Sequence, residues 1–251
     1  QKDGWISEVS ALITDGDRVR PADFTSSRTG KPVLSAGEAF KKELGDFAAT
    51  ATLVETATPA GFIEIASVQS QPISRWITHI LQTSENIETE MIGKLVSDDL
   101  GFDGSFESLD PAIKRALGTT GLDFTDVQIR DASGLSQLNM VSPKFMAELM
   151  RLINSEFADF GQIKRSLSIA GESGTLGGRF KGKIADAAGK ILAKNGYIVG
   201  VHTLNGIINA KDGTVLTFTI YSTGKVGSDV RTAIDTLATA FYRCGDNLSN
   251  E

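Results

Sequence analysis

Apolar residues recur at helical spacing in three parts of the chain. One stripe predicts a helix over Pro72–Gln82, and a second stripe starts at Ile87. The segment Thr83–Asn86 is therefore expected to be a junction between two helices. A third stripe predicts a last helix near the carboxyl end, which we expect Ser228 to cap.

Three further helices are predicted from the residues that begin them. Ser35 and Glu38 have the spacing of a capping box, which indicates a helix over residues 35–47. Asp110-Pro111 and Ser142-Pro143 each place a capping residue before a proline. Helices are expected to follow them, to about residues 118 and 153.

Strand-like patterns gather near the carboxyl end. A short apolar run leads into Lys194-Asn195-Gly196, and two strands are predicted over Tyr197–Ile208 and Thr214–Tyr221. The Asp-Gly pair in the connection between them is typical of a hairpin turn. Shorter strands are predicted over residues 5–13, 61–68 and 129–131. Helices around an antiparallel meander favour an α/β fold beside an all-helical lobe.

Two short groups of residues carry candidate chemistry. Lys194 beside Gly196 on a strand edge suits capture of a carboxylate, although a lone lysine on a strand is more often an ordinary solvated charge. Ser84 and Asn86 can face one side of a cleft, where a hydroxyl passes a proton and an amide holds a carbonyl. Ser84 can also be no more than a helix cap.

These groups have the order of a known signature. Ser-x-Asn followed far downstream by Lys-Thr/Ser-Gly is typical of penicillin-recognising serine enzymes. Between and around them stand the segments QSQPIS (69–74), DASGLS (131–136) and GTL (174–176). With these segments, the chain resembles the class C low-molecular-mass penicillin-binding proteins. These are the D-alanyl-D-alanine carboxypeptidases and endopeptidases that trim peptidoglycan. The resemblance covers nearly the whole chain and implies the transpeptidase/β-lactamase-like fold.

The resemblance also implies roles for individual residues. Ser84 would pass a proton to the leaving amine, Asn86 would position the substrate and the lysine, and Lys194 would stabilise the substrate carboxylate. Asn195 departs from the family, which has Thr or Ser there, and we expect an altered substrate preference or a reduced affinity for β-lactams from that change. Gly196 would keep the strand edge open. Peptidoglycan stem peptides would be the substrates and β-lactams the inhibitors, with no metal or cofactor.

The nucleophilic Ser-x-x-Lys motif of the family is not found upstream of Ser84. The resemblance places it before Gln1, so residues 1–33 would be the tail of an inserted accessory domain with a linker. Residues 34–251 would be the carboxy-terminal part of the catalytic domain, inactive without the missing amino-terminal segment. Ser222 and Lys225 have the right spacing, but they follow the Lys194 strand and Gly224 opposes a helix there. Two alternatives remain: a non-catalytic protein that binds peptidoglycan peptides, and an intracellular hydrolase that uses Ser222 and Lys225.

Composition excludes some functions and leaves others open. A net charge of −6 over 251 residues argues against a nucleic-acid partner. No apolar run reaches the roughly 20 residues of a membrane span. Cys244 is expected to be a buried or late-helix thiol, and the isolated His79 and His202 form no metal-ligand cluster. The glycine-rich residues 171–178 are expected to form a structural turn and not a phosphate loop. An extracytoplasmic location follows from the implied substrate.

Overall fold

The computed structural model describes residues 4–23, 26–57, 60–224 and 227–248. Contacts divide the chain into two units. The first unit contains Gln1–Gln71 and Asn86–Met91, and the second contains Pro72–Glu85 and Ile92–Glu251. The predicted boundary near residue 33 stays a prediction about domain organisation. No helix in the described part of the chain is both long and apolar enough to cross a membrane.

The described residues of the first unit form short helices and extended chain without regular strands. Its helical elements are η1 (Asp15–Asp17), α1 (Pro32–Leu44) and η2 (Gly45–Ala48). The predicted capping box is wrong, because α1 already begins at Pro32 and the Ser35 hydroxyl donates to the Lys31 carbonyl. Proline suits this first turn because its missing N–H would have no helical partner.

Two strands predicted in this unit are absent from its described residues. Residues 5–13 and 61–68 carry no strand assignment, and Phe62, Ile63 and Ile65 are exposed. Alternating apolar residues form a strand only when another strand pairs with them, and no described strand pairs with either segment. Both predictions are therefore wrong for the structure of this chain.

The second unit opens with helices whose starts mostly follow the sequence. Ser142 caps its helix by accepting a hydrogen bond from the Phe145 N–H, as predicted. Asp110 is not a cap, because its helix begins one residue earlier; its carboxylate instead accepts from the Ile129 N–H at 2.8 Å. The predicted strand over 129–131 is wrong, because these residues carry no strand assignment and an isolated bridge pairs the preceding Gln128 with Met140. The helices of this part are α2 (Ile73–Thr83), α3 (Asn86–Asp99, which begins in the first unit), α4 (Leu109–Ala116), α5 (Pro143–Asn154) and α6 (Phe160–Ser166).

An antiparallel sheet follows, in the order β1-β2-β3-β4. The strands are β1 (Ser168–Ile169), β2 (Ile191–Ile198), β3 (Val201–Asn209) and β4 (Val215–Thr223). The predicted strand over Tyr197–Ile208 is wrong in one respect. The chain reverses inside it at Gly200, whose φ of +85° is open to glycine at little cost. The short helices η3 (Gly174–Leu176) and η4 (Gly182–Ala187) lie between β1 and β2, so residues 171–178 form turns as expected.

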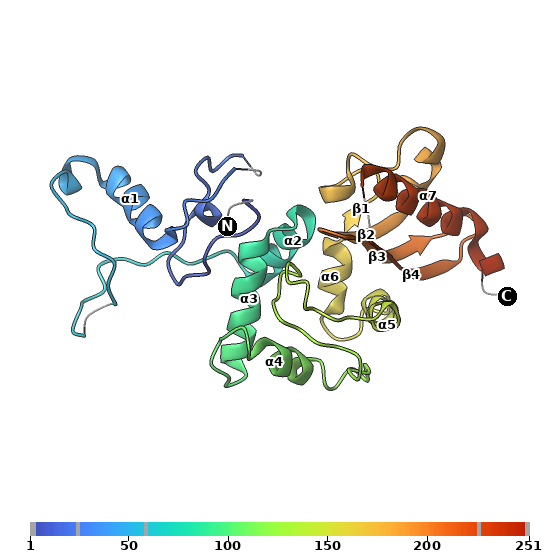
Figure 1. Ribbon diagram of the computed structural model, residues 1–251, viewed down its shortest axis with the longest axis horizontal. Coiled ribbons are helices and arrows are strands. Elements are labelled where there is room, and N and C mark those ends of the chain that lie inside the picture. The colour runs from blue at the N-terminus through green and yellow to red at the C-terminus, as the bar shows by residue number, and fades with distance from the viewer. Residues whose placement is uncertain (1–3, 24–25, 58–59, 225–226, 249–251) are drawn as a thin grey trace. The chain divides into compact units, whose positions relative to one another are not determined.

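The last helix, α7 (Ser228–Cys244), covers one face of the sheet, and α5 and α6 cover the other (Figure 1). Gly227 occupies the cap position, so Ser228 is the first helical residue and not its cap. Cys244 is the last residue of α7 and its thiol is exposed, so the late-helix alternative is confirmed and the buried one is wrong. The short η5 (Gly245–Leu248) follows it. An antiparallel sheet between helices confirms the predicted α/β architecture.

Side chains alternate between the two faces of the sheet. Ile191 and Ala193 of β2 pack in the cluster under α7, whereas Leu192 contacts the cluster under α5 and α6. Asn195 therefore belongs to the α7 face, and Lys194 belongs to the opposite face. This alternation decides which groups each residue of the Lys194-Asn195-Gly196 segment can reach.

Candidate active site

Ser84 ends α2 in an unusual backbone conformation. Its φ and ψ of 60° and 43° are left-handed, and its N–H donates to the Ile80 carbonyl at 2.7 Å. This end of α2 is fixed by Gln82, whose Nε2 donates to the carbonyls of Ser166 and Leu167 at 3.0 and 2.9 Å. Non-glycine residues rarely adopt this conformation, and such strain gathers at functional sites.

Lys194 meets Ser84 although 110 residues separate them in the sequence. The Lys194 Nζ donates to the Ser84 Oγ at 2.8 Å and to the Asn195 carbonyl at 2.6 Å. Burial lowers the pKa of the Lys194 ammonium from 10.5 to about 8, because no solvent shell offsets its charge. No carboxylate in the described residues lies within ion-pair distance of this ammonium.

This pair can exchange a proton near neutral pH. A lysine with a pKa of about 8 gives up and regains its proton at little cost, and a hydroxyl both donates and accepts. The geometry therefore suits proton transfer to or from a group that reaches Ser84. The sequence prediction named both residues, but only the fold brings them together.

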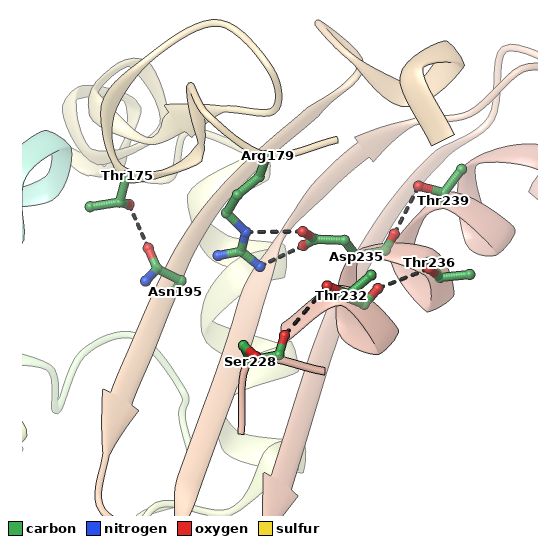
Figure 2. A network of polar contacts seen from close by, with 8 residues as sticks. All are labelled: Thr175, Arg179, Asn195, Ser228, Thr232, Asp235, Thr236 and Thr239. Carbon is green, nitrogen blue, oxygen red and sulfur yellow. Dashed lines mark hydrogen bonds and ion pairs between the residues drawn. The ribbon is translucent and has the colours of Figure 1, made fainter. Parts of the chain in front are cut away.

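Asn195 is held from the side by a loop. Thr175 of η3 donates its hydroxyl to the Asn195 Oδ1, as Figure 2 shows. The loop lies close to α2 because Gly174 has no side chain; a Cβ there would lie 2.2 Å from the Ser168 Oγ and 2.5 Å from the Gln82 Oε1. The Asn195 amide oxygen is thus occupied, and only its Nδ2 remains to donate to a ligand.

Gly196 serves the packing of the strand as well as access to its edge. A Cβ at this position would lie 2.6 Å from the Thr203 Oγ1 on the neighbouring strand, closer than real Cβ contacts. The other side of the strand is open. β1 pairs only with Leu192 and Ala193, so in the described residues the Lys194–Ile198 part of β2 has no strand on that side. Backbone groups on that side, apart from the Asn195 carbonyl that already accepts from Lys194, can pair with an extended peptide.

A buried ion pair braces the α7 face beside Asn195. The Arg179 guanidinium binds both carboxylate oxygens of Asp235, and both side chains are nearly buried. Figure 2 shows Arg179 turned toward α7, where the Thr239 hydroxyl donates to the Asp235 carbonyl at 2.8 Å. In the same view Thr232 and Thr236 donate to carbonyls one helical turn earlier. Sequence reasoning missed this brace, because Arg179 and Asp235 belong to no spaced motif, and it gave Thr175 no role beyond its place in the GTL segment.

Asn86 lies at the start of α3 and belongs to the first unit by its contacts. There its Nδ2 donates to the Trp5 carbonyl at 2.8 Å. Its predicted role in holding a substrate carbonyl stays a prediction.

The structure describes only one residue of the alternative Ser222–Lys225 pair. Ser222 lies within β4, opposite His202 of β3, and does not open a helix. Lys225 lies outside the described residues. Neither His79 nor His202 joins a metal-ligand cluster in the described part of the chain.

Comparison with known proteins identifies relatives along nearly the whole chain. Residues 19–241 match the D-Ala-D-Ala carboxypeptidase 3 (S13) family. The chain is 32% identical over 245 residues to a carboxypeptidase of Mycobacterium tuberculosis, covering 96% of this chain and 52% of that protein. It is 33% identical to the carboxypeptidase DacB of Mycolicibacterium smegmatis, with coverages of 96% and 53%. The chain therefore spans about half the length of the curated relatives it matches.

A solved structure supports the fold. Penicillin binding protein 4 of Haemophilus influenzae, complexed with a β-lactam, superposes with a TM-score of 0.73 at 20% identity. The match covers 87% of this chain and 52% of that one. The penicillin-recognising fold predicted from the sequence is thereby confirmed.

Proposed function

Because the chain belongs to the D-Ala-D-Ala carboxypeptidase 3 family, we propose that it is the part of a serine-type D-alanyl-D-alanine carboxypeptidase or endopeptidase that binds substrate and transfers protons. The substrates are peptidoglycan stem peptides, and the protein acts outside the cytoplasmic membrane, where peptidoglycan lies. β-Lactams inhibit it by acylating the attacking serine. That serine, with its Ser-x-x-Lys lysine, is supplied from the part of the relatives' length that this chain does not span.

One observation carries the proposal: the Lys194 Nζ lies 2.8 Å from the Ser84 Oγ beside an open strand edge. A stem peptide pairs with the free edge of β2, and this brings its scissile amide next to Ser84. Ser84 passes a proton to the leaving amine. Lys194 donates a hydrogen bond to Ser84 and, with a pKa of about 8, can exchange a proton with it. Asn86 positions the substrate, the Asn195 Nδ2 donates to it, and Gly196 leaves the strand edge accessible.

The reaction has two steps. The attacking serine gives its proton to the lysine of its Ser-x-x-Lys motif, and its oxygen forms a bond to the carbonyl carbon of the scissile amide. The C–N bond breaks as the amine takes a proton from Ser84, and Ser84 regains a proton from that lysine. Water then adds to the acyl-enzyme ester, and the serine leaves with a proton. Both steps conserve atoms without a metal or redox partner.

Intact-mass spectrometry after incubation with benzylpenicillin tests the proposal. We compare the 251-residue chain with a polypeptide extended to the full length of the relatives. An adduct on the extended polypeptide alone is expected. An adduct on the 251-residue chain would show that the attacking serine lies within this chain, and Ser222 would be the first residue to substitute. No adduct on either would favour a non-catalytic protein that binds peptidoglycan peptides, which Asn195 in place of Thr or Ser also favours.

Substitution of Lys194 tests its role in the extended polypeptide. Lys194→Met is expected to reduce acylation by benzylpenicillin by about 100-fold or more, the range of a lost general acid–base group. Lys190→Met changes an exposed lysine at the entry of the same strand and provides the matched control. Equal acylation by the two variants would contradict the assignment.

A further inference from the structure

A small pocket opens on the α7 face of the sheet, beside Asn195. It has a volume of about 280 Å³, and its lining includes the side chains of Tyr197 and His202 from the sheet and Arg231 from α7. Lys194 points to the opposite face and makes its hydrogen bonds there. Any charge recognition in this pocket is therefore separate from the Lys194–Ser84 pair.

The described residues leave one positive charge in the pocket unmatched. The other arginine of the lining, Arg179, is neutralised by its two bonds to Asp235. Arg231 is exposed, and no hydrogen bond or ion pair joins it to a described residue. The pocket also lies at the amino end of α7, where the helix dipole favours negative charge.

His202 shows that this environment is electropositive. Partial burial lowers the pKa of its imidazole, and the charges of Arg231 and Arg179 lower it further. The ring stacks on Tyr197 with 4.6 Å between the centroids. His202 is therefore neutral at pH 7 and can offer an N–H donor without adding a second unmatched charge.

An extended ligand on the free edge of β2 can reach this pocket. Asn195 and Tyr197 lie on the α7 face of the same strand that carries Lys194 on its other face. The Asn195 Oδ1 is occupied by Thr175, so Asn195 contributes only its Nδ2. A guanidinium presents paired donors that match a carboxylate, and one unmatched positive charge fits a monoanion better than a phosphate dianion.

We propose that Arg231, with His202 and the Asn195 Nδ2, binds the terminal carboxylate of the ligand and so sets the preference for a free carboxyl end. This inference rests on the proposed function. It assigns recognition of the ligand carboxylate to Arg231 of α7, which belongs to none of the sequence motifs. The role of Lys194 is then proton transfer.

Rates of acylation in the extended polypeptide test it. Benzylpenicillin, which carries a carboxylate, is compared with its methyl ester by intact mass, and the ratio of the two rates is the readout. The parent is expected to prefer the acid by tenfold or more, as for a charge-assisted hydrogen bond. Arg231→Gln is expected to bring the ratio close to one, whereas Arg231→Lys keeps part of it.

The control is Arg243→Gln, on the same helix, where the arginine is already paired with Asp186. It is expected to leave the ratio unchanged. An Arg231→Gln variant that keeps the parental ratio would overturn the inference and leave the proposed function standing. No acylation by either compound in the parent would refute both.

Discussion

Replacing Lys194 by methionine is expected to stabilise the fold at neutral pH. The substitution keeps the length of the side chain and removes an ammonium that burial disfavours. The fall in pKa from 10.5 to about 8 corresponds to roughly 3 kcal/mol of penalty on the charged form. The hydrogen bonds to Ser84 and to the Asn195 carbonyl are lost, at about 1 kcal/mol each. The variant is therefore expected to be about 1 kcal/mol more stable at pH 7.

The sign of this difference depends on pH. Below pH 8 both folded and unfolded chains carry the lysine proton, and the folded parent bears the whole penalty. Between pH 8 and 10.5 the folded lysine is neutral while the unfolded lysine is still charged, so the penalty fades as pH rises. Above 10.5 only the lost hydrogen bonds remain, and the methionine variant becomes the less stable protein.

Urea unfolding at pH 7, 8.5 and 10 measures this crossing. Groups that titrate in both proteins contribute equally to their free energies of unfolding, so these contributions cancel in the difference between variant and parent. Lys190→Met removes an exposed lysine and is expected to show no such crossing. A Lys194→Met difference that stays constant from pH 7 to 10 would refute the reasoning, because burial of charge would not then govern this residue.

Substitutions at other positions also have definite expected results by urea unfolding. Ser84→Gly relieves a left-handed serine but removes the hydroxyl that accepts from Lys194, so two effects of about 1 kcal/mol each should nearly cancel; a loss of about 2 kcal/mol or more would show that the hydroxyl matters more. Gly196→Ala should cost about 1–3 kcal/mol, and adding Thr203→Ala should restore most of it by removing the clashing hydroxyl. Asp235→Asn breaks a pair whose side chains are 11% and 7% exposed and should cost about 3–5 kcal/mol. Asp186→Asn, in an exposed pair, should cost far less than Asp235→Asn, and equal costs would contradict the role of burial.

Short-range patterns in the sequence predicted much of the local structure. The stripe before Ser84 and the Ser142-Pro143 start predicted α2 and α5 correctly, because helix periodicity and caps act over a few residues. The apolar pattern of residues 61–68 failed for the opposite reason. A strand depends on a partner from elsewhere in the chain, which short-range patterns do not reveal.

The same distinction applies to the site. Spaced motifs named Ser84, Asn86 and Lys194-Asn195-Gly196, and the family resemblance gave them roles. Tertiary structure alone brought the Lys194 ammonium to the Ser84 hydroxyl and lowered its pKa, since burial is a property of packing. The pocket that contains Arg231 was likewise decided by the fold, because residues of β2, β3 and α7 line it together and no motif joins them.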